Sequence, residues 1–417
     1  MRTFKRILLV AGCLLLVAQI PFAVNLYRTA RLASEIEEMN RSRSSVPDLG
    51  FKDYKGVIHV HSFVGGHSTG TFDELIRAAN ENGLDFVVMT EHVANEFDSS
   101  AKTLNEKHGR AIWIGGNETT TSGGEKFLVI EGFDELNKLR FVSTDELLSE
   151  IGGREKLAFV TYPESFKSWD SDFDGIEVFS LHTNAKGMNP FLFLMDAVWS
   201  FRTYPELTMA RHFRRPSENL ARFDKVAESR KVSLFGGNDA HSNIGFHLFG
   251  DDANNKLFEI KYDRYGTIFR LMRTHILIPE HEELSREAIL AALRSGRSFL
   301  GLDILGDSSG FVFYSEAGNG APVASAGSDV ARGSVLQVVS PLPARIVILK
   351  DGTKIFESEA VRSAEFEAKE TGTYRVEAYL DSLGAPFDEM PWVITNPIYV
   401  RNPSALNTGV PKPTNQN

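Results

Sequence analysis

Apolar and polar positions divide the chain into an apolar start, a stretch of alternating strand and helix patterns, and a final stretch of strand patterns. The start is the uncharged run ILLVAGCLLLVAQIPFAV, residues 7–24, after the basic segment MRTFKR. A helix of about 18 apolar residues can cross a bilayer. Small residues of a cleavage site are not obvious after the run, so we favour an uncleaved anchor over a signal peptide. We predict an anchor over residues 1–33 and a polar, Ser-rich linker over residues 34–52.

From Phe51 short apolar runs alternate with amphipathic segments. The segment GVIHVHS is predicted to be a strand, and TFDELIRAANENGLD is predicted to be a helix. Thr71 has the residue type of an N-cap, Glu74 completes a capping box, and Gly83 marks the end of the helix. The first strand–helix unit is therefore well defined by its own sequence.

The same alternation continues along the chain. The segment FVVMTEH, residues 86–92, is the next predicted strand, and further units follow at residues 111–119, 144–164, 175–180 and 220–241. Strands that alternate with helices form mostly parallel sheets. We predict an α/β domain over residues 53–300, built as a barrel or an open sheet.

Helical patterns stop near residue 300. Several strand patterns follow, and Asp351-Gly352 stands between two of them as a hairpin signal. In TYRVEAYL apolar and polar residues alternate, as in a strand with one buried face. We predict a small β-sandwich over residues 301–403 and a disordered tail over residues 404–417.

Composition adds limits to this organisation. The chain has 417 residues, of which 42% are hydrophobic and 24% charged, and this is enough for two folded domains. Its net charge of -10 gives no basic surface for nucleic acid, so we expect no nucleic-acid partner. Cys13 is the only cysteine and lies in the apolar run, so the rest of the chain has no disulfide and no thiolate nucleophile.

Charges around the apolar run give its orientation. Arg2, Lys5 and Arg6 precede the run, whereas Arg28 and Arg31 follow it. The positive-inside rule therefore gives a modest preference for a cytoplasmic N-terminus. We expect a protein that is anchored in the membrane, with its bulk on the extracytoplasmic side.

Histidines mark the ends of the predicted strands. Side chains two residues apart in a strand point to the same face, so His59 and His61 converge at the end of GVIHVH. Glu91 and His92 end the next strand, and α/β folds carry their sites at this edge of the sheet.

A third strand end repeats the arrangement, because GGNDAH places Asp239 and His241 there. Packing does not easily explain imidazoles and carboxylates at three strand ends. Mixed ligands of this kind suit Zn, Mn or Fe, and there are more of them than one ion can use. The pattern predicts a cluster of two or three divalent transition-metal ions.

These motifs resemble those of the PHP (polymerase and histidinol phosphatase) family of metal-dependent phosphoesterases. The resemblance covers about residues 53–250 and rests on four motifs in the family's order: HVH followed by His67, TEH at residues 90–92, Glu118 in GGNET, and Asp239 and His241 in GGNDAH. It implies a distorted (βα)7 barrel.

The resemblance also implies the ligand sets. One ion would be held by His59, His61, Glu118 and Asp239, and a second set would be His67, His92 and His241. Glu118 would bridge to a further ion. Asp239 would also take part in catalysis, and Glu91, which replaces the usual Asp, would orient or accept a proton without binding metal.

One position departs from the family pattern. Tyr162 stands in LAFVTYPES where the family has a metal-binding histidine. Tyr162 could bind weakly, His182 could replace the histidine, or the middle site could be empty. The number of ions therefore stays open.

The later part of the chain resembles the PHP subgroup with C-terminal β domains that includes carbaryl hydrolases. This implies that the substrate is a small phosphoester, carbamate or carboxylic ester. The basic cluster RHFRRP, with Arg211, Arg214 and Arg215, is a candidate anion-binding site, although such clusters are more often solvated surface. Metal-activated water would carry out hydrolysis, and the alternative is a non-catalytic, metal-stabilised binding module of the cell envelope.

Overall fold

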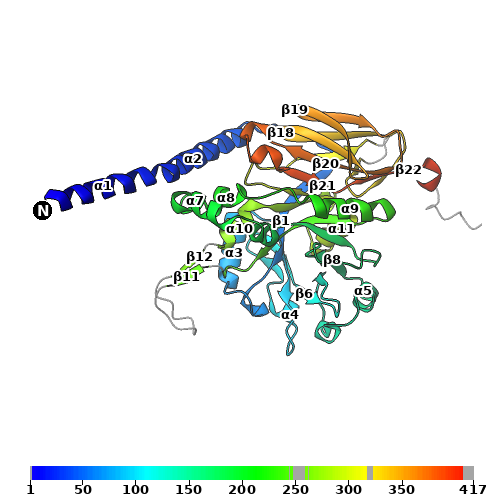
Figure 1. The fold of residues 1–417 in the computed structure, drawn as a ribbon. Helices are drawn as coiled ribbons and strands as arrows, with labels where there is room; N and C mark the ends of the chain where they lie inside the picture. Colours follow the sequence, from blue (N-terminus) through cyan, green and yellow to red (C-terminus); the bar gives the residue numbers. More distant parts are fainter. Residues whose placement is uncertain (1, 244, 248–258, 262, 317–322, 407–417) are drawn as a thin grey trace, which may run out of the picture.

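The computed structural model describes residues 2–243, 245–247, 259–261, 263–316 and 323–406. It is a mixed α/β structure with one long helix projecting from the body (Figure 1). One sheet holds 20 of the described strands, and a separate two-stranded sheet consists of β11 (Gly245–His247) and β12 (Glu259–Lys261). The predicted α/β class is confirmed.

Parallel strands form the centre of the large sheet. β1 (Phe51–Val60) lies between β2 (Phe86–Met89) and β10 (Ser233–Ala240), and it is parallel to both. The parallel set continues outward through three more strands: β5 (Ala111–Ile114) beside β2, β9 (Gly175–Ser180) beside β10, and β8 (Leu157–Thr161) beside β9.

Further pairings connect the two outer strands of this set. β3 (Glu91–His92) follows β2 and pairs in parallel with β6 (Gly116–Thr120), which follows β5. β7 (Lys126–Ile130) pairs antiparallel with both β6 and β8. The circuit therefore leads by strand pairing from β1 through β2 to β5, along the chain from β5 into β6, and by strand pairing again through β7, β8, β9 and β10 back to β1. β7 was not among the predicted strands.

Helices cover the outside of these strands. The predicted helix is α3 (Phe72–Glu81), and its predicted capping box is present, because the Glu74 N–H donates to Thr71 Oγ1 over 3.3 Å and the Thr71 N–H donates to Glu74 Oε2 over 2.9 Å. Its buried face includes Leu75, which packs in the core with Val57 and Val60 of β1. The other helices before residue 300 are α4 (Ser99–Lys102), α5 (Thr144–Gly153), α6 (Leu181–Lys186), α7 (Pro190–Ser200), α8 (Pro205–Ala210), α9 (Ser217–Ser229), α10 (Tyr265–Leu271) and α11 (Arg286–Ser295).

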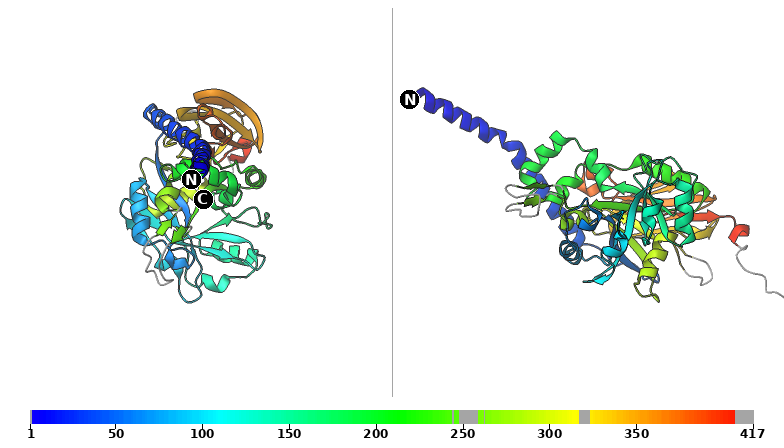
Figure 2. Two further views of the ribbon diagram at one scale, coloured as in Figure 1. Left: turned by 60° about the vertical axis from the view of Figure 1, so that its left-hand side comes forward. Right: turned by 90° about the horizontal axis from the view of Figure 1, so that it is seen from below.

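The N-terminal segment is helical for longer than predicted. α1 (Arg2–Ala18) leads directly into α2 (Ile20–Arg41), and the two project together from the body (Figure 2). Within the described residues, this is the one helical segment that is long enough and apolar enough to cross a membrane, and a signal sequence has the same properties. α2 runs into the predicted linker, and Leu32 at the end of the predicted anchor and Ile36 in the linker are both buried. The polar composition of this segment hid the apolar positions at helical spacing.

The segment after α2 is also attached to the body. Arg43 forms an ion pair with Asp307 at 2.7 Å, and Arg362 donates to the carbonyl of Ser42 at 3.0 Å. Residues 42–50 therefore follow the surface of the later strands and do not form a free stalk.

The described chain after residue 300 consists mainly of antiparallel strands, which lie at the top of Figure 1. The Asp351-Gly352 turn joins β18 (Val335–Lys350) to β19 (Thr353–Glu367), and both turn residues have positive φ, 49° and 76°, so the hairpin prediction is confirmed. The other strands here are β15 (Val312–Ser315), β16 (Ala324–Ser325), β17 (Asp329–Ala331), β20 (Gly372–Tyr379), β21 (Val393–Thr395) and β22 (Ile398–Arg401).

Hydrogen bonding is continuous across residue 300. β14 (Ser298–Gly301) pairs with β13 (Arg273–Pro279) on one side and with β21 on the other, and β13 pairs with β1. The strands on the two sides of the predicted domain boundary thus belong to one sheet. α12 (Pro403–Leu406) covers the start of the predicted disordered tail, and residues 407–417 lie outside the described residues.

Candidate metal centre

Four side chains meet at the carboxyl ends of the strands. His59 and His61 come from the end of β1, Glu118 from β6 and Asp239 from β10. All four are buried. Four distances join the two histidines to the two carboxylates: His59 Nε2 lies 3.5 Å from Glu118 Oε2 and 3.3 Å from Asp239 Oδ1, and His61 Nε2 lies 3.5 Å from each of these oxygens.

These facing atoms have no hydrogen-bond partner within the described part of the chain. The buried, unsatisfied atoms are His59 Nε2, His61 Nε2, Glu118 Oε2 and Asp239 Oδ1. Buried polar atoms are normally paired, so four orphans around one point require an explanation. Ligand atoms about 2.0–2.2 Å from a tetrahedral ion lie about 3.3–3.6 Å apart, which matches the four distances. The donor set therefore fits a divalent metal ion.

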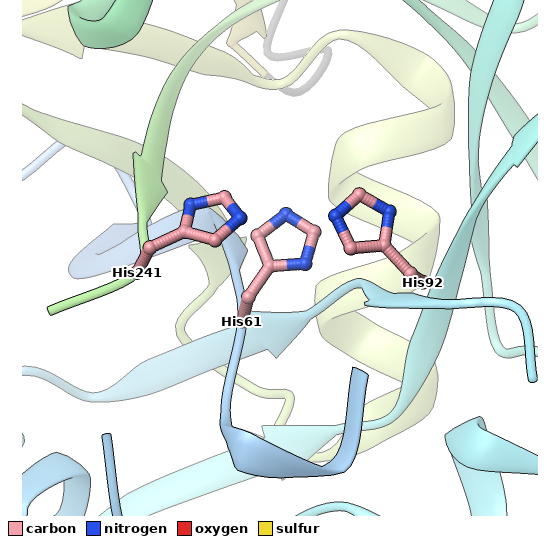
Figure 3. A group of neighbouring side chains, drawn as sticks. All are labelled: His61, His92 and His241. Carbon is pink, nitrogen blue, oxygen red and sulfur yellow. The ribbon is translucent and has the colours of Figure 1, made fainter. Parts of the chain in front are cut away.

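A second group of possible ligands shares His61. His61, His92 and His241 offer nitrogen atoms that all lie within 4.8 Å of one another. The His61 ring stands between the other two, 4.6 Å from the His92 ring and 4.2 Å from the His241 ring (Figure 3). The two carboxylates also reach this group, because His92 Nδ1 lies 3.5 Å from Glu118 Oε2 and His241 Nδ1 lies 3.3 Å from Asp239 Oδ1.

His67, which the sequence grouped with His92 and His241, lies at the rim. It is exposed, and its ring is 4.9 Å from that of His92 at an interplanar angle of 71°. The structure thus brings His67 beside the second group without including it among the three clustered nitrogens.

A buried carboxylate holds the first histidine from behind. Glu177 of β9 is fully buried and accepts a hydrogen bond from His59 Nδ1, with oxygens at 3.1 and 3.2 Å. Metal-binding histidines usually have such a partner, which fixes the ring and its tautomer. The backbone makes room for Glu177, because a Cβ on Gly237 would lie 1.7 Å from Glu177 Oε1. This explains one glycine of the GGNDAH motif.

Sequence reasoning missed Glu177. The signal was present, because GIEVFS places one charged residue inside an apolar strand pattern. A charge in such a position is rarely fully buried unless it is paired.

The backbone is strained at the centre. His59, Tyr162 and Asp239 have φ values of 69°, 51° and 44° in the left-handed region. The strand pairing shifts register between Ile58 and Val60. Such conformations persist only where the surroundings enforce them, and they cluster at functional sites. His59 and His61 thus converge through a kink and not through regular strand alternation.

Electrostatics set the protonation of the side chains at the centre. Burial lowers the pKa of His61 to about 3 and that of His92 to about 4, so both imidazoles are neutral at pH 7. Burial alone would raise the pKa of Glu118 and Asp239, but the nearby histidines, His59 above all, hold both pKa values well below the usual range. Ionised carboxylates and neutral imidazoles are the forms that bind metal. Burial alone would lower the pKa of His59, but the carboxylates of Glu177 and Asp239 outweigh burial and raise that pKa well above its usual value, so His59 would release a proton when metal binds.

Glu91 has a different environment from the other acidic residues. Its carboxylate accepts hydrogen bonds from the Ser62 N–H at 3.0 Å, the Gly65 N–H at 3.1 Å and Thr103 Oγ1 at 2.7 Å, and also from Ser62 Oγ. Because Ser62 and Gly65 belong to the turn that follows His61, these hydrogen bonds let Glu91 fix the conformation of that turn. Burial raises its pKa despite these bonds.

Tyr162 lies directly at the centre. Its hydroxyl donates to Asp239 Oδ2 over 2.7 Å, the oxygen that does not face the two histidines. Burial and the negative charge of Asp239 raise the pKa of Tyr162 far above its usual value, so the phenol keeps its proton. His182 of α6 is farther away, with Nδ1 3.9 Å from the same oxygen.

Lys126 is a second residue that sequence reasoning missed. Its ammonium group donates to Glu118 Oε1 over 2.7 Å and lies 4.7 Å from the centre of the Tyr162 ring. It begins β7, the strand that the sequence pattern did not reveal. Because this strand was not predicted, the sequence gave no reason to place Lys126 near the metal centre.

Two of the three arginines of the predicted anion-binding cluster lie beside carboxylates. Arg215 forms an ion pair with Glu377 of β20, and Arg211 lies 4.0 Å from Asp196. Arg214 is exposed and lines a cavity of about 350 Å³ beside α6 and the start of α9. None of the clustered histidines lines that cavity. The anion-binding role of the cluster stays a prediction, and its place is this cavity and not the group of clustered histidines.

Comparisons with known proteins give no close relative. No protein-family model matches the chain, and no curated protein does. Among solved structures, a two-domain protein from Bacteroides vulgatus, described as containing a predicted PHP-like metal-dependent phosphoesterase, is similar with 15% identity and a TM-score of 0.39, over 85% of this chain and 98% of that one. PsfC from Pseudomonas syringae is similar with 12% identity and a TM-score of 0.36, over 59% of this chain and 90% of that one.

The description of the Bacteroides protein names the family whose motifs this sequence resembles. At this level of similarity, neither neighbour assigns an activity to the chain.

Proposed function

We propose that the chain is a metal-dependent hydrolase that cleaves a small phosphoester, carbamate or carboxylic ester. The observation that supports this most directly is the set of four orphaned, buried ligand atoms on His59, His61, Glu118 and Asp239, at separations suited to one ion. His92 and His241 would hold a second ion beside the shared carboxylates. The ions would be Zn, Mn or Fe, two or three in number.

Bound ions would supply a water molecule of lowered pKa and neutralise charge that develops on the substrate oxygen. The chain's own residues prepare for this. Glu177 orients the His59 ring through Nδ1, so that Nε2 points into the centre. Tyr162 stays protonated and donates a hydrogen bond to Asp239 Oδ2, which leaves Oδ1 directed at the histidines. Lys126 neutralises the outer oxygen of Glu118.

The proposal gives Glu91 a supporting role. Because its oxygens accept four protein hydrogen bonds, we assign it to holding the turn after His61 and not to proton transfer. Asp239 keeps the predicted roles of ligand and of catalytic residue, and its contact with His241, like that of Glu118 with His92, would let it bridge the two groups. His67 and His182, both partly or fully exposed at the rim, are the residues placed to meet a substrate.

The proposal includes the finer architecture and the location. The circuit of strands from β1 back to β1 is what a distorted barrel requires, and the strands after residue 300 would form the sandwich. The long N-terminal helix would anchor the chain, and the charges that flank it favour an extracytoplasmic body.

A second candidate is a non-catalytic, metal-stabilised binding module. Its support is the Tyr162–Asp239 hydrogen bond, because a protonated phenol occupies the place of a family histidine and would leave the middle position without a ligand. One structural ion and no turnover would then be expected.

Metal analysis and an ester screen separate the two candidates. Full-length protein in detergent would be loaded with Zn or Mn and analysed for moles of metal per chain. It would then be assayed with p-nitrophenyl phosphate, bis-p-nitrophenyl phosphate and a naphthyl carbamate. The hydrolase predicts at least two ions per chain and turnover that His59→Ala reduces at least 100-fold.

The control variant is His281→Ala, because the His281 side chain is 83% exposed and does not belong to any of the four metal-binding motifs. It should keep both metal and activity. One ion per chain with no turnover of any substrate would favour the binding module. No bound metal after loading would contradict both.

A further inference from the structure

α7 turns apolar side chains to the outside and its one charged side chain towards the protein, the reverse of an ordinary surface helix. Its sequence, PFLFLMDAVWS, contains one charged residue, Asp196. Asp196 points into the protein, where its carboxylate accepts a hydrogen bond from Asn25 Nδ2 at 2.8 Å and lies 3.0 Å from His212 Nε2. A surface helix of a globular protein normally places its charges outward.

The outward face of α7 is apolar. The exposed fractions are 66% for Phe191, 54% for Leu192, 60% for Leu194, 48% for Val198 and 42% for Trp199. Phe191, Leu194 and Val198 are spaced by three and four residues and form one row along the helix. Leu192 and Trp199, seven residues apart, form a second row beside it, so the five side chains make one broad stripe. A contiguous apolar surface of this kind marks a binding surface in a soluble domain.

The position of α7 indicates what binds to its apolar stripe. α7 packs against α2, and the Asn25–Asp196 hydrogen bond joins them directly after the apolar run 7–24. A helix of this length rises about 27 Å, close to the thickness of the hydrocarbon core of a bilayer. If residues 7–24 cross the membrane, Asn25 lies at its surface and α7 lies at the same level (Figure 1).

The neighbouring residues suit a lipid surface. Trp199 lies near the end of the stripe, and tryptophan is enriched where membrane meets water. Lys186 before α7 and Arg202 after it are exposed and positively charged, as anionic headgroups would require.

We propose that α7 is an interfacial membrane helix, which inserts the stripe Phe191, Leu192, Leu194, Val198 and Trp199 among the lipid headgroups and upper acyl chains. Together with the N-terminal span, it gives the body two attachments to the bilayer. The orientation of the body relative to the membrane is thereby fixed, and the site does not swing on a flexible tether.

Contact quenching tests this proposal on the full-length protein. The chain would be reconstituted in vesicles of phosphatidylcholine and phosphatidylglycerol with bromine near the headgroup end of the acyl chains. Bromine quenches tryptophan only at close range. Trp113 and Trp392 are buried, and Trp169 packs against Phe166, so Trp199 is the tryptophan placed to meet lipid.

The expected result is that brominated lipid quenches part of the fluorescence, and that Trp199→Phe removes most of the quenched component. Leu194→Glu should reduce quenching at least twofold. Ile355→Glu is the matched control, because Ile355 is also exposed, at 39%, but lies on β19. It should leave quenching unchanged.

Two outcomes would overturn the proposal. Equal quenching of wild type and Trp199→Phe would mean that α7 does not touch lipid. A dimer in vesicles that Leu194→Glu dissociates, without loss of quenching, would mean that a second copy covers the stripe. Alkaline extraction of the same vesicles reports separately on the N-terminal span, so loss of the span is not mistaken for loss of α7 contact.

Discussion

At the scale of single residues, the centre depends on groups that support the ligands as much as on the ligands. Glu177 fixes the His59 ring, and Gly237 leaves the space that Glu177 occupies. The sequence could identify His59, His61 and Asp239 as candidates because each carries a ligand atom at a strand end, and it could identify Glu118 through the resemblance to family motifs. It could not identify Glu177, because the role of Glu177 depends on which strand lies beside β10.

Glu177→Gln tests this support. Glutamine keeps an acceptor for His59 Nδ1 but removes the negative charge that increases the basicity of the ring. We expect metal affinity to fall about 10–100-fold, the range seen when such outer partners are lost. Competition with a chromogenic chelator would measure it on the full-length protein.

His281→Gln is the control for this variant, since it removes an exposed histidine. Unchanged affinity in Glu177→Gln would mean that the His59 ring is held in place by packing alone.

At the scale of elements, a buried ionic network attaches α9 to β20. Arg375 of β20 is 2% exposed and makes two hydrogen bonds to Asp224 of α9, at 2.6 and 2.8 Å, and one to Glu377, at 2.6 Å. Arg215 binds Glu377 from the segment before α9. The sequence predicted α9 and β20 correctly as a helix and a strand. It could not show that RHFRRP contributes to their contact, because a basic cluster looks the same whether its partner is a ligand or a distant strand.

Arg375→Met should destabilise the fold strongly. The substitution leaves the Asp224 carboxylate buried without its partner, and breaking a buried pair in this way costs about 3–5 kcal/mol. Chemical denaturation in detergent would measure the change in the free energy of unfolding.

Arg401→Met is the comparison, because Arg401 pairs with Asp329 at the surface, over 3.4 Å with both side chains about one-third exposed. A surface pair contributes about 1 kcal/mol or less. Equal costs for the two variants would show that the buried network contributes no more than a surface pair.

At the scale of the whole molecule, a second buried cluster connects parts that are distant in the sequence. His275 of β13 contacts Asp53 of β1 at 2.9 Å, and its other nitrogen lies 3.3 Å from Asp303 and 3.1 Å from Ser308 Oγ. Asp307, beside this cluster, holds Arg43 from the segment after α2. The N-terminal segment, the first strand and the later strands thus meet at one polar junction. Sequence patterns are local, so they could not show that strands on the two sides of the predicted domain boundary pair with each other.

This junction makes stability depend on pH. Burial alone would lower the pKa of His275, but Asp53 and Asp303 outweigh it and raise that pKa to about 10. In the unfolded chain a histidine has a pKa of about 6.5. The folded state therefore binds this proton more tightly, and the stabilisation is complete below about pH 6.5 and is lost as the pH rises towards 10. Thermal unfolding of wild type and His275→Gln between pH 6 and pH 10 would measure it. The difference in Tm should be largest near pH 6 and should shrink steadily as the pH rises, whereas a difference that is constant with pH would mean that His275 is neutral in the folded protein.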